Sequence, residues 1–217
     1  MTLFSGHALT CRRGERLVFR GLDFALDAGA ALVLTGPNGS GKSSLLRLMA
    51  NLLPPQSGTL SWEGRAIARD AAAHRARLHF IGHQDALKPV LTVFETVAFW
   101  GGLRGGNEET AVASLVRFGL DHLADSPCRL LSAGQRKRVS LARLLAGKAP
   151  LWLLDEPTTG LDDASTRRFE TLLAEHREAG GIVVATTHIP LGLADARTLS
   201  LGDFAPSRDD GALLGEF

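Results

Sequence analysis

Short apolar runs recur along the chain at the length of a β-strand, and a glycine or a charged residue follows each of the first three. Runs of this kind lie at 17–19, 22–26, 31–35, 59–64, 79–84, 151–154 and 182–186. Gly14, Gly21 and Gly29 punctuate the first part of the chain. We therefore interpret that part as short strands joined by turns.

Helical periodicity, with apolar residues three and four positions apart, alternates with these runs. The predicted helices cover 42–50, 66–78, 92–100, 109–120, 132–147 and 163–180. Thr92 and Glu95 have the spacing of a capping box, in which each side chain bonds the backbone N–H of the other residue, so a helix should begin there. Asn51 suits a left-handed cap at the end of the first helix.

The alternation of buried strands and helices predicts an α/β core with a mostly parallel sheet and helices on both faces. The helical run at 86–148 interrupts this alternation and is interpreted as an inserted α-helical subdomain. We expect a single domain over 1–217, with its α/β core at 1–85 and 149–201. Residues 202–217 are polar and glycine-spaced, and we expect this tail to be ordered only in part.

The composition excludes several classes of protein. The 217 residues are 45% hydrophobic, enough for one sizeable core, and carry 24 basic and 23 acidic side chains, a net charge of +1. This balance gives no general reason to expect nucleic acid or an anionic membrane as a partner. Cys11 and Cys128 lie far apart, which argues against a disulfide scaffold and favours a reducing compartment. Because the sequence has no export signal and no apolar run of the roughly 20 residues that cross a bilayer, we expect membrane attachment only through a partner.

The segment GPNGSGKS at 36–43 follows a predicted strand and opens a predicted helix. Its glycines let successive backbone N–H groups approach an anion, and the helix dipole adds partial positive charge. Lys42 adds a point charge for the β- and γ-phosphates of a nucleotide and is expected to be exposed at the mouth of the site, with no role in the core. The Ser43 hydroxyl is a ligand for Mg²⁺. The alternative is a chance match in a glycine-rich turn, but the flanking strand and helix favour a nucleotide site. Its candidate binding residues are Gly36, Pro37, Asn38, Gly39, Ser40, Gly41, Lys42, Ser43 and Ser44.

Asp155 and Glu156 end the apolar run at 151–154. An α/β sheet binds ligands at the carboxyl ends of its strands, which places both carboxylates at the nucleotide site. Asp155 would hold Mg²⁺ through water, and Glu156 would orient and activate the attacking water. The alternative is an acidic pair that only caps the following turn, and the glycine-rich segment at 36–43 favours the catalytic interpretation.

Six motifs in a fixed order resemble the nucleotide-binding domain of ABC ATPases, and the resemblance covers nearly all of residues 3–200. They are GPNGSGKS at 36–43, Gln84 in GHQ, LSAGQ at 131–135, LWLLDEP at 151–157, GLD at 160–162 and TTH at 186–188. The resemblance implies a phosphate-loop ATPase with ATP and Mg²⁺ as cofactors and an antiparallel β subdomain at the N-terminus. It also implies a homodimer that closes on ATP.

The resemblance assigns roles to single residues as well. Gln84 resembles the loop glutamine that touches Mg²⁺ or the lytic water, and a solvent-facing amide is the alternative. His188 resembles the switch histidine that contacts the γ-phosphate and would complete the catalytic set, with a packed histidine as the alternative. The metal set would be Ser43, Gln84 and Asp155. His83, beside Gln84, has no second metal ligand at useful spacing and receives no role.

One further motif resembles the signature segment of ABC ATPases, which in that family contacts ATP held by a second subunit. It comprises Ser132, Ala133, Gly134 and Gln135. Ser132 and Gln135 also have capping-box spacing, which any helix start could use, and both interpretations can hold together. Asp162 resembles the residue that couples the two sites across the dimer, with a helix cap as the alternative.

Two positions depart from the family pattern. The signature usually has two glycines, and Ala133 replaces the first, adding a methyl group that loosens the phosphate contact slightly. The family also stacks an aromatic ring on adenine from the loop near 11–16, where this chain has CRRGER and no tyrosine anywhere. Arg12 or Arg13 could stack a guanidinium on the base instead, with weak adenine discrimination as the consequence, or the segment is only a solvated basic turn.

Chain architecture narrows the class further. Chromosome-binding relatives have long coiled coils between the phosphate loop and the signature, and the segment 44–130 is too short to contain them. Translation-factor relatives have two nucleotide-binding domains in tandem, whereas this chain has one. The chain resembles the separate ATP-binding subunit of a transporter that docks on integral-membrane partners. Residues 80–100 and 180–191 resemble most the haem-exporter family of bacterial cytochrome c maturation. This resemblance implies that the chain hydrolyses ATP at the cytoplasmic side of the inner membrane, and that hydrolysis is coupled to the handling of haem or its chaperone. The alternatives are the ATP-binding subunit of another small ABC exporter and a nucleotide-gated clamp without turnover.

The segment 93–100 predicts a docking surface. Its apolar side chains point to more than one side of a helix. If one face packs on the subdomain, the apolar side chains on the other faces would need a partner protein to bury them. The resemblance places this segment and the Gln84 loop where a membrane subunit inserts a short coupling helix. Some of Phe94, Phe99 and Trp100 should then be exposed, whereas the alternative is a helix wholly buried in the subdomain.

Overall fold

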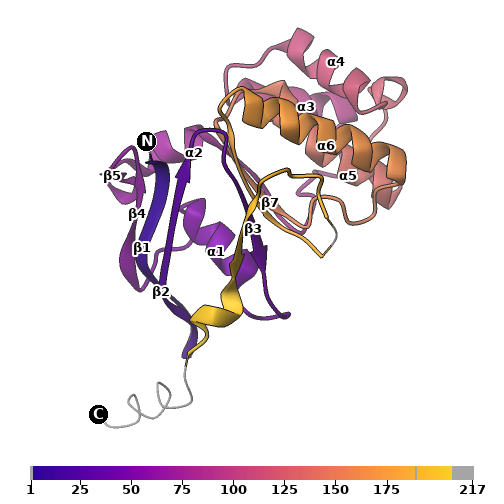
Figure 1. The fold of residues 1–217 in the computed structure, drawn as a ribbon. Helices are drawn as coiled ribbons and strands as arrows, with labels where there is room; N and C mark the ends of the chain where they lie inside the picture. Colours follow the sequence, from indigo (N-terminus) through magenta and orange to yellow (C-terminus); the bar gives the residue numbers. More distant parts are fainter. Residues whose placement is uncertain (1, 189, 207–217) are drawn as a thin grey trace.

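Two β-sheets and a cluster of helices make up the described chain, residues 2–188 and 190–206 of the computed structural model (Figure 1). The strands are β1 (Thr2–Arg13), β2 (Arg16–Asp27), β3 (Ala31–Thr35), β4 (Ser57–Trp62), β5 (Arg65–Ala66), β6 (Leu78–Ile81), β7 (Leu151–Asp155), β8 (Ile182–Thr186) and β9 (Arg197–Ser200). The α-helices are α1 (Lys42–Met49), α2 (Ala71–Ala76), α3 (Val93–Gly102), α4 (Glu108–Arg117), α5 (Ala133–Ala146) and α6 (Asp163–Glu178). Most of the predicted tail, 207–217, lies outside the described residues.

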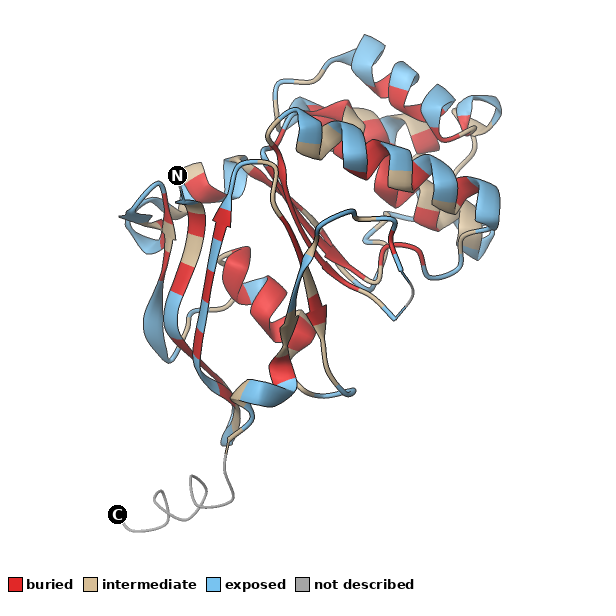
Figure 2. Cartoon of the chain, viewed as in Figure 1, coloured by how far each residue is buried: buried red, intermediate tan, exposed pale blue. Residues whose placement is uncertain are grey.

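The two sheets differ in strand direction. The first is antiparallel, with strand order β2-β1-β4-β5, and the second is parallel throughout, with order β6-β7-β8-β3-β9. The predicted α/β fold with an N-terminal antiparallel β subdomain is therefore confirmed. β7 and β8 lie in the middle of the parallel sheet, and all ten of their residues are buried, which explains why their sequences are continuous apolar runs (Figure 2).

Alternate residues of the parallel sheet belong to two separate cores. On one face, Leu151, Leu153 and Val184 pack with α1 and the antiparallel sheet. On the other face, Trp152 and Val183 pack with α3, α4, α5 and α6. Figure 1 shows α1 between the two sheets and α3, α4, α5 and α6 grouped on the far side of the parallel sheet. This arrangement leaves the loop before α1 at the carboxyl edge of the parallel strands.

The N-terminal sheet corrects one prediction. Runs 17–19 and 22–26 are not two short strands but parts of the single strand β2. Gly21 adopts φ +67 inside this strand, and the pairing with β1 shifts between the Leu9–Leu22 and Cys11–Phe19 partners. Gly21 therefore forms a bulge, where an extra residue is accommodated, rather than a turn.

The strand β9 was not predicted. It is a four-residue edge strand, paired on one side with β3, and its residues are exposed or half-buried. Because a short, exposed edge strand buries few side chains, its sequence need not alternate apolar and polar residues. The sequence RTLS at 197–200 therefore does not predict a strand.

The predicted helix starts and stops are confirmed where a cap was identified. Thr92 caps α3, and the full capping box with Glu95 is present. Asn51, just after α1, has the left-handed φ of +53. Among the described residues, each helix is too short or too polar to cross a bilayer.

Candidate nucleotide-binding site

The loop from 36 to 41 joins β3 to α1 and has the backbone geometry of an anion cradle. Gly41, the residue before α1, has φ +106, and a Cβ there would lie 2.5 Å from Cγ1 of Val18. Only glycine fits this position. No side chain caps the start of α1, and no acidic residue lies in its first turn. The first N–H groups of the helix therefore remain available to an anion from solution.

Lys42 was expected to be exposed at the mouth of the site, and this is wrong. The residue is only 9% exposed, and its ammonium donates hydrogen bonds to the carbonyl oxygens of Gly36 (2.7 Å) and Pro37 (3.2 Å). The physical reason is that the lysine folds back on its own loop, where two carbonyls replace water around the charge. The ammonium nevertheless lies at the loop that would hold the phosphates.

Thr186 organises the two carboxylates at the end of β7. Its hydroxyl donates to Oδ1 of Asp155 (2.7 Å), and the Thr186 hydroxyl oxygen accepts from the backbone N–H of Glu156 (3.0 Å). Thr186 itself is fully buried and Asp155 is 5% exposed. Because β7 and β8 are parallel neighbours, the last residue of one strand reaches the last residue of the other. The carboxylate of Asp155 is therefore held in one orientation.

Glu156 has a strained backbone and a fixed side chain. Its φ of +53 is rare for a residue with a Cβ and costs of order 1–3 kcal/mol. Its Oε1 lies 3.0 Å from Nε2 of His188, and its Oε2 accepts a hydrogen bond from the Thr159 hydroxyl at 3.1 Å. Strain that is held by neighbours on both carboxylate oxygens is typical of functional positions.

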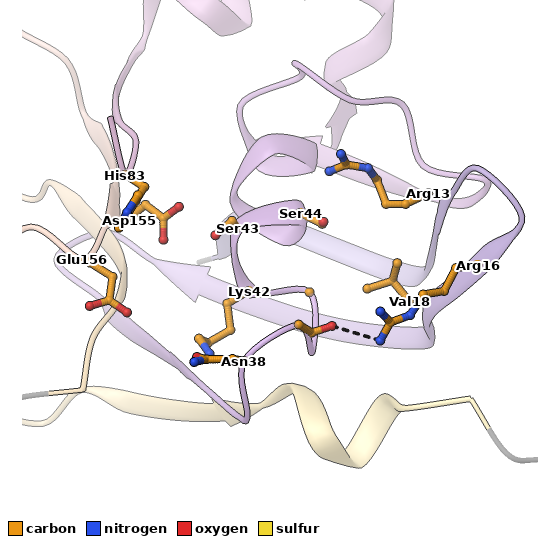
Figure 3. Close-up of a pocket in the computed structure, with 12 residues that line it drawn as sticks. Arg13, Arg16, Val18, Asn38, Lys42, Ser43, Ser44, His83, Asp155 and Glu156 are labelled. Carbon is orange, nitrogen blue, oxygen red and sulfur yellow. Dashed lines mark hydrogen bonds between the residues drawn. The ribbon is translucent and has the colours of Figure 1, made fainter. Parts of the chain in front are cut away.

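A cavity of about 410 Å³ brings these groups together (Figure 3). It is lined by Arg13, Arg16, Val18, Asn38, Gly39, Gly41, Lys42, Ser43, Ser44, His83, Asp155 and Glu156. The predicted cradle and the predicted carboxylates therefore share one cavity, although they are more than a hundred residues apart. Gln84 is exposed and is not among the lining residues, whereas its neighbour His83 is.

The same cavity has donors suited to Mg²⁺. Ser43 and Asp155 both line it, and Thr186 keeps the Asp155 carboxylate oriented. Mg²⁺ prefers hard oxygen ligands and retains several waters, so one hydroxyl and one carboxylate fit it better than a soft metal. No group of three or more His, Cys, Asp or Glu suited to a metal occurs among residues 2–188 and 190–206, so the metal would depend on phosphate oxygens and water as well.

Three lining or neighbouring residues lie in segments quoted in the sequence analysis but received no role there. Arg16 belongs to β2, His83 follows β6, and Thr186 ends β8. Sheet pairing brings the strands that carry or precede them to the site, and their distances along the sequence do not predict this. Of the two arginines considered for base stacking, Arg13 lines the cavity and Arg12 does not, since Arg12 donates instead to the Gly14 carbonyl at 3.1 Å.

Lys137 is a further buried charge near the carboxylates. It lies on α5, is 5% exposed, and burial lowers its pKa, an effect that Asp85, Asp155 and Glu156 partly oppose. A lysine that keeps its charge in such a place needs negative neighbours. Lys137 therefore places a positive charge of α5 near the carboxylates at the end of β7.

The signature segment forms a second, smaller cavity of about 180 Å³. It is lined by Ser132, Gly134, Gln135, Arg138, Gly160, Leu161, Asp162 and Ser165. The capping box is present, with Ser132 N donating to Gln135 Oε1 (2.8 Å) and Gln135 N donating to Ser132 Oγ (3.2 Å). Ala133 is exposed and outside the lining set.

Asp162 also lines this cavity and caps α6. Its Oδ1 accepts a hydrogen bond from Ser165 N at 2.7 Å, and this bond lowers the pKa of the carboxyl group. The helix-cap alternative is therefore correct for Asp162, and a role in coupling is compatible with it. Arg138, which had no predicted role, also lines this cavity and adds a cation to it.

The predicted docking segment is partly exposed. Phe99 is 55% exposed, while Phe94 and Trp100 are half-buried. A small cavity of about 60 Å³ beside it is lined by Ala86, Lys88, Leu91, Thr96, Phe99 and Trp100. The guanidinium of Arg143, on α5, lies 3.8 Å from the Trp100 ring centre and donates to the Asp85 carbonyl at 3.4 Å. The helix α3 is therefore tied to the loop that contains Gln84 without being wholly buried.

Comparison with known proteins agrees with this geometry. A family model described as ABC transporter matches residues 19–159. The chain is similar to the cytochrome c biogenesis ATP-binding export protein CcmA of Paramagnetospirillum magneticum, with 55% identity over 210 residues that cover 95% of this chain and 97% of that protein. The protein of the same description from Rhodospirillum rubrum is 55% identical over 98% of this chain and 92% of its own length. An ABC transporter ATP-binding protein from Pyrococcus furiosus shares the fold, with a TM-score of 0.80 at 21% identity over 94% of this chain and 99% of that one.

Proposed function

The chain belongs to the ABC transporter family, and within it to the cytochrome c biogenesis ATP-binding export proteins, so we propose that it is the ATP-hydrolysing subunit of a transporter for c-type cytochrome biogenesis. One observation carries this proposal beyond family membership. The phosphate loop, Asp155 and Glu156 line one cavity, so a bound triphosphate would have a cradle at one side and a base at the other.

The cradle would hold the phosphates with the residues from Gly36 to Ser44. Backbone N–H groups at the start of α1 and the Lys42 ammonium would bind the β- and γ-phosphates once Lys42 exchanges its two loop carbonyls for phosphate oxygens. Ser43 and Asp155 would hold Mg²⁺, which when bound neutralises charge on the phosphates. Gln84 is the third proposed metal contact, and its exposed position means that it would have to turn inward to act.

Glu156 would act as the general base. Its carboxylate accepts the proton of the attacking water, while Thr159 and His188 hold its two oxygens in place. His188, with its side chain 57% exposed, has the second task of contacting the γ-phosphate. Because these contacts already order the side chain of Glu156, it would lose little conformational entropy when it positions the water.

A second copy of the chain would complete the site. The signature residues Ser132, Ala133, Gly134 and Gln135 open α5, and a helix start is an anion site. We propose that they contact ATP held by the partner copy in a homodimer that closes on ATP. Asp162 lies in the same small cavity as Ser132, which supports a role in coupling the two sites.

The membrane subunit would dock on residues 93–100 and the Gln84 loop. Phe99 offers an exposed aromatic ring, and Arg143 connects Trp100 to the Asp85 carbonyl in that loop. This surface would place the chain peripherally at the cytoplasmic side of the inner membrane. Haem or a haem-handling chaperone is the proposed cargo, and residues 86–148 would form the α-subdomain that relays docking to the α/β core at 1–85 and 149–201.

Steady-state ATP hydrolysis by the purified chain, alone and with its membrane subunits in vesicles, tests this function. We expect hydrolysis in both states and stimulation by the membrane subunits. ATP binding without turnover in either state would favour the nucleotide-gated clamp instead. Turnover that is stimulated by a different exporter's membrane subunits, and not by those of cytochrome c biogenesis, would assign the chain to that exporter.

A further inference from the structure

One buried side of α5 is polar and lies against the residue that follows Gln84. Lys137, Ser140 and Arg143 stand three residues apart on this helix and are 5%, 1% and 5% exposed. The Ser140 hydroxyl and the Arg143 guanidinium each donate a hydrogen bond of 3.4 Å to the Asp85 carbonyl oxygen. The Asp85 carboxylate attracts the Lys137 ammonium. Three side chains of α5 therefore interact with one residue of the Gln84 loop.

The ammonium of Lys137 has no direct partner within the part of the chain that the structure describes. It forms neither a hydrogen bond nor a close ion pair there, although the residue is almost fully buried. The carboxylates of Asp85, Asp155 and Glu156 act on its charge from a greater distance. Burial of a cation without a hydrogen-bond acceptor is unfavourable. An acceptor that moved close to Lys137 would therefore stabilise the chain.

Among the three carboxylates, that of Asp85 is the one that can approach. Thr186 holds Asp155 by a hydrogen bond of 2.7 Å, and both carboxylate oxygens of Glu156 already have partners. The proposed function also assigns Asp155 to Mg²⁺ and Glu156 to the attacking water. Asp85 lies instead between β6 and α3, outside any helix or strand.

The segment around Asp85 is held weakly in its present position. Both bonds to its carbonyl are longer than the 2.7–3.2 Å of ordinary N–H···O contacts. Nε of Arg143 is buried without a hydrogen-bond partner, and Ala86 has φ +50, which is unfavourable for a residue with a Cβ. A polar contact that is only partly satisfied leaves room for a second arrangement with better pairing.

We propose that Lys137 is a positioning residue for Gln84: during hydrolysis the Asp85 carboxylate pairs directly with the Lys137 ammonium, and this ion pair holds Gln84 at the nucleotide cavity. Lys137 lies near Asp155 and Glu156, which line that cavity, so a shift of Asp85 toward Lys137 carries its neighbour Gln84 in the same direction. The inference rests on the proposed function, because it requires ATP hydrolysis in which Gln84 turns inward.

ATP turnover and calorimetric binding of Mg²⁺-ATP by Asp85→Asn, Lys137→Met and the double variant test the inference. Each single change should lower kcat about 3- to 30-fold, within the range for coupled residues, and leave the dissociation constant within about twofold. The double variant should lose no more than the weaker single variant, because either change alone breaks the pair. Lys137→Arg keeps the charge and should keep kcat within about threefold of the parent. Asp121→Asn, at an exposed carboxylate of the helical subdomain, is the matched control and should behave as the parent.

Urea unfolding of the same variants without nucleotide separates positioning from a structural role. The direct pair is absent from the described structure, so the two changes should combine independently in the unfolding constant, within about threefold. Coupling of equal size in unfolding and in kcat would show an ordinary structural contact and overturn the positioning role. If Lys137→Met does not fold, Asp85→Asn and Lys137→Arg still test the pair, because the first must lower kcat and the second must keep it.

The remaining outcomes distinguish this inference from the proposed function. A parent chain that hydrolyses ATP, together with an Asp85→Asn variant of equal kcat, would overturn the inference alone. Losses that multiply in the double variant would also overturn it, since they show that the two residues act separately. A parent chain that does not hydrolyse ATP, alone or with its membrane subunits, would overturn the proposed function and this inference together.

Discussion

Nε2 of His188 lies 3.0 Å from Oε1 of Glu156, and these two residues come from loops that follow adjacent parallel strands. The contact holds a carboxylate whose own backbone has a positive φ. Thr186, one strand-end away, fixes the Glu156 backbone through its hydroxyl. The geometry of the Glu156 carboxylate therefore depends on β8 as much as on β7, which is why a histidine 32 positions later in the chain can contact it.

Glu156→Gln should retain ATP binding and lose hydrolysis by roughly 10² to 10⁴-fold, because the amide keeps the shape of the side chain but cannot accept the proton. Since two copies are proposed to trap ATP between them, this variant should also accumulate as an ATP-dependent dimer. Turnover assays and light scattering with and without ATP measure the two effects. Glu175→Gln, on the outer part of α6, is the matched control and should hydrolyse ATP as the parent does. A Glu156→Gln chain that stays monomeric at saturating ATP and still turns over would contradict both roles.

Lys42→Ala should lose nucleotide binding while the fold survives. The ammonium's partners are two carbonyls of its own loop, so its removal leaves the apolar cores unchanged. Loss of a charge-assisted phosphate contact weakens binding strongly. Calorimetry with Mg²⁺-ATP and a thermal melt measure the two properties, and Lys148→Ala, an exposed lysine beyond α5, serves as control. If Lys42→Ala binds ATP as tightly as the parent, the phosphate loop is not the binding site.

Acid should destabilise the chain through His79. This residue is 2% exposed, its Nε2 lies 2.8 Å from the Gly147 carbonyl oxygen, and burial lowers its pKa from 6.5 to about 3. Between these values the unfolded chain binds the proton and the folded chain does not. The stability contribution is therefore complete above pH 6.5 and is lost as the pH falls toward 3, by up to about tenfold in the unfolding constant per pH unit.

Urea unfolding of the parent and of His79→Gln at pH 7 and pH 5 checks this prediction. Glutamine keeps an N–H donor for the Gly147 carbonyl and does not titrate, so the variant should lose less stability between the two pH values. The exposed His122→Gln is the control and should follow the parent. An equal pH response in the parent and His79→Gln would show that His79 does not carry the effect.

The sequence predicted the fold and the elements that carry the proposed site residues because those depend on local rules. Strand, cradle and helix start are adjacent in the chain at 36–43, and Ser132 and Gln135 cap their own helix. Contacts made across the fold were not predictable in this way. Thr186 and Arg16 reach the site through sheet pairing, and the fold-back of Lys42 depends on carbonyl orientations that no residue pattern encodes.

The docking surface gives the last prediction. Phe99 is 55% exposed on α3, beside a cavity of about 60 Å³, and an exposed ring next to an apolar hollow is typical of a protein contact. Phe99→Glu should spare the ATP hydrolysis of the isolated chain, because Phe99 is not among the residues lining the nucleotide cavity. It should abolish co-purification with the membrane subunits, since burying a carboxylate in place of an aromatic ring at the contact costs free energy.

Val112→Glu is the matched control for that experiment. Val112 is 49% exposed on α4, in the same helical cluster but outside the cavity beside Phe99, so its replacement adds the same charge to a different face. We expect this variant to assemble with the membrane subunits as the parent does. If Phe99→Glu assembles normally and Val112→Glu does not, the membrane subunit docks on α4 instead of α3. If both variants assemble, neither face is the docking surface, and the proposed role of residues 93–100 is wrong.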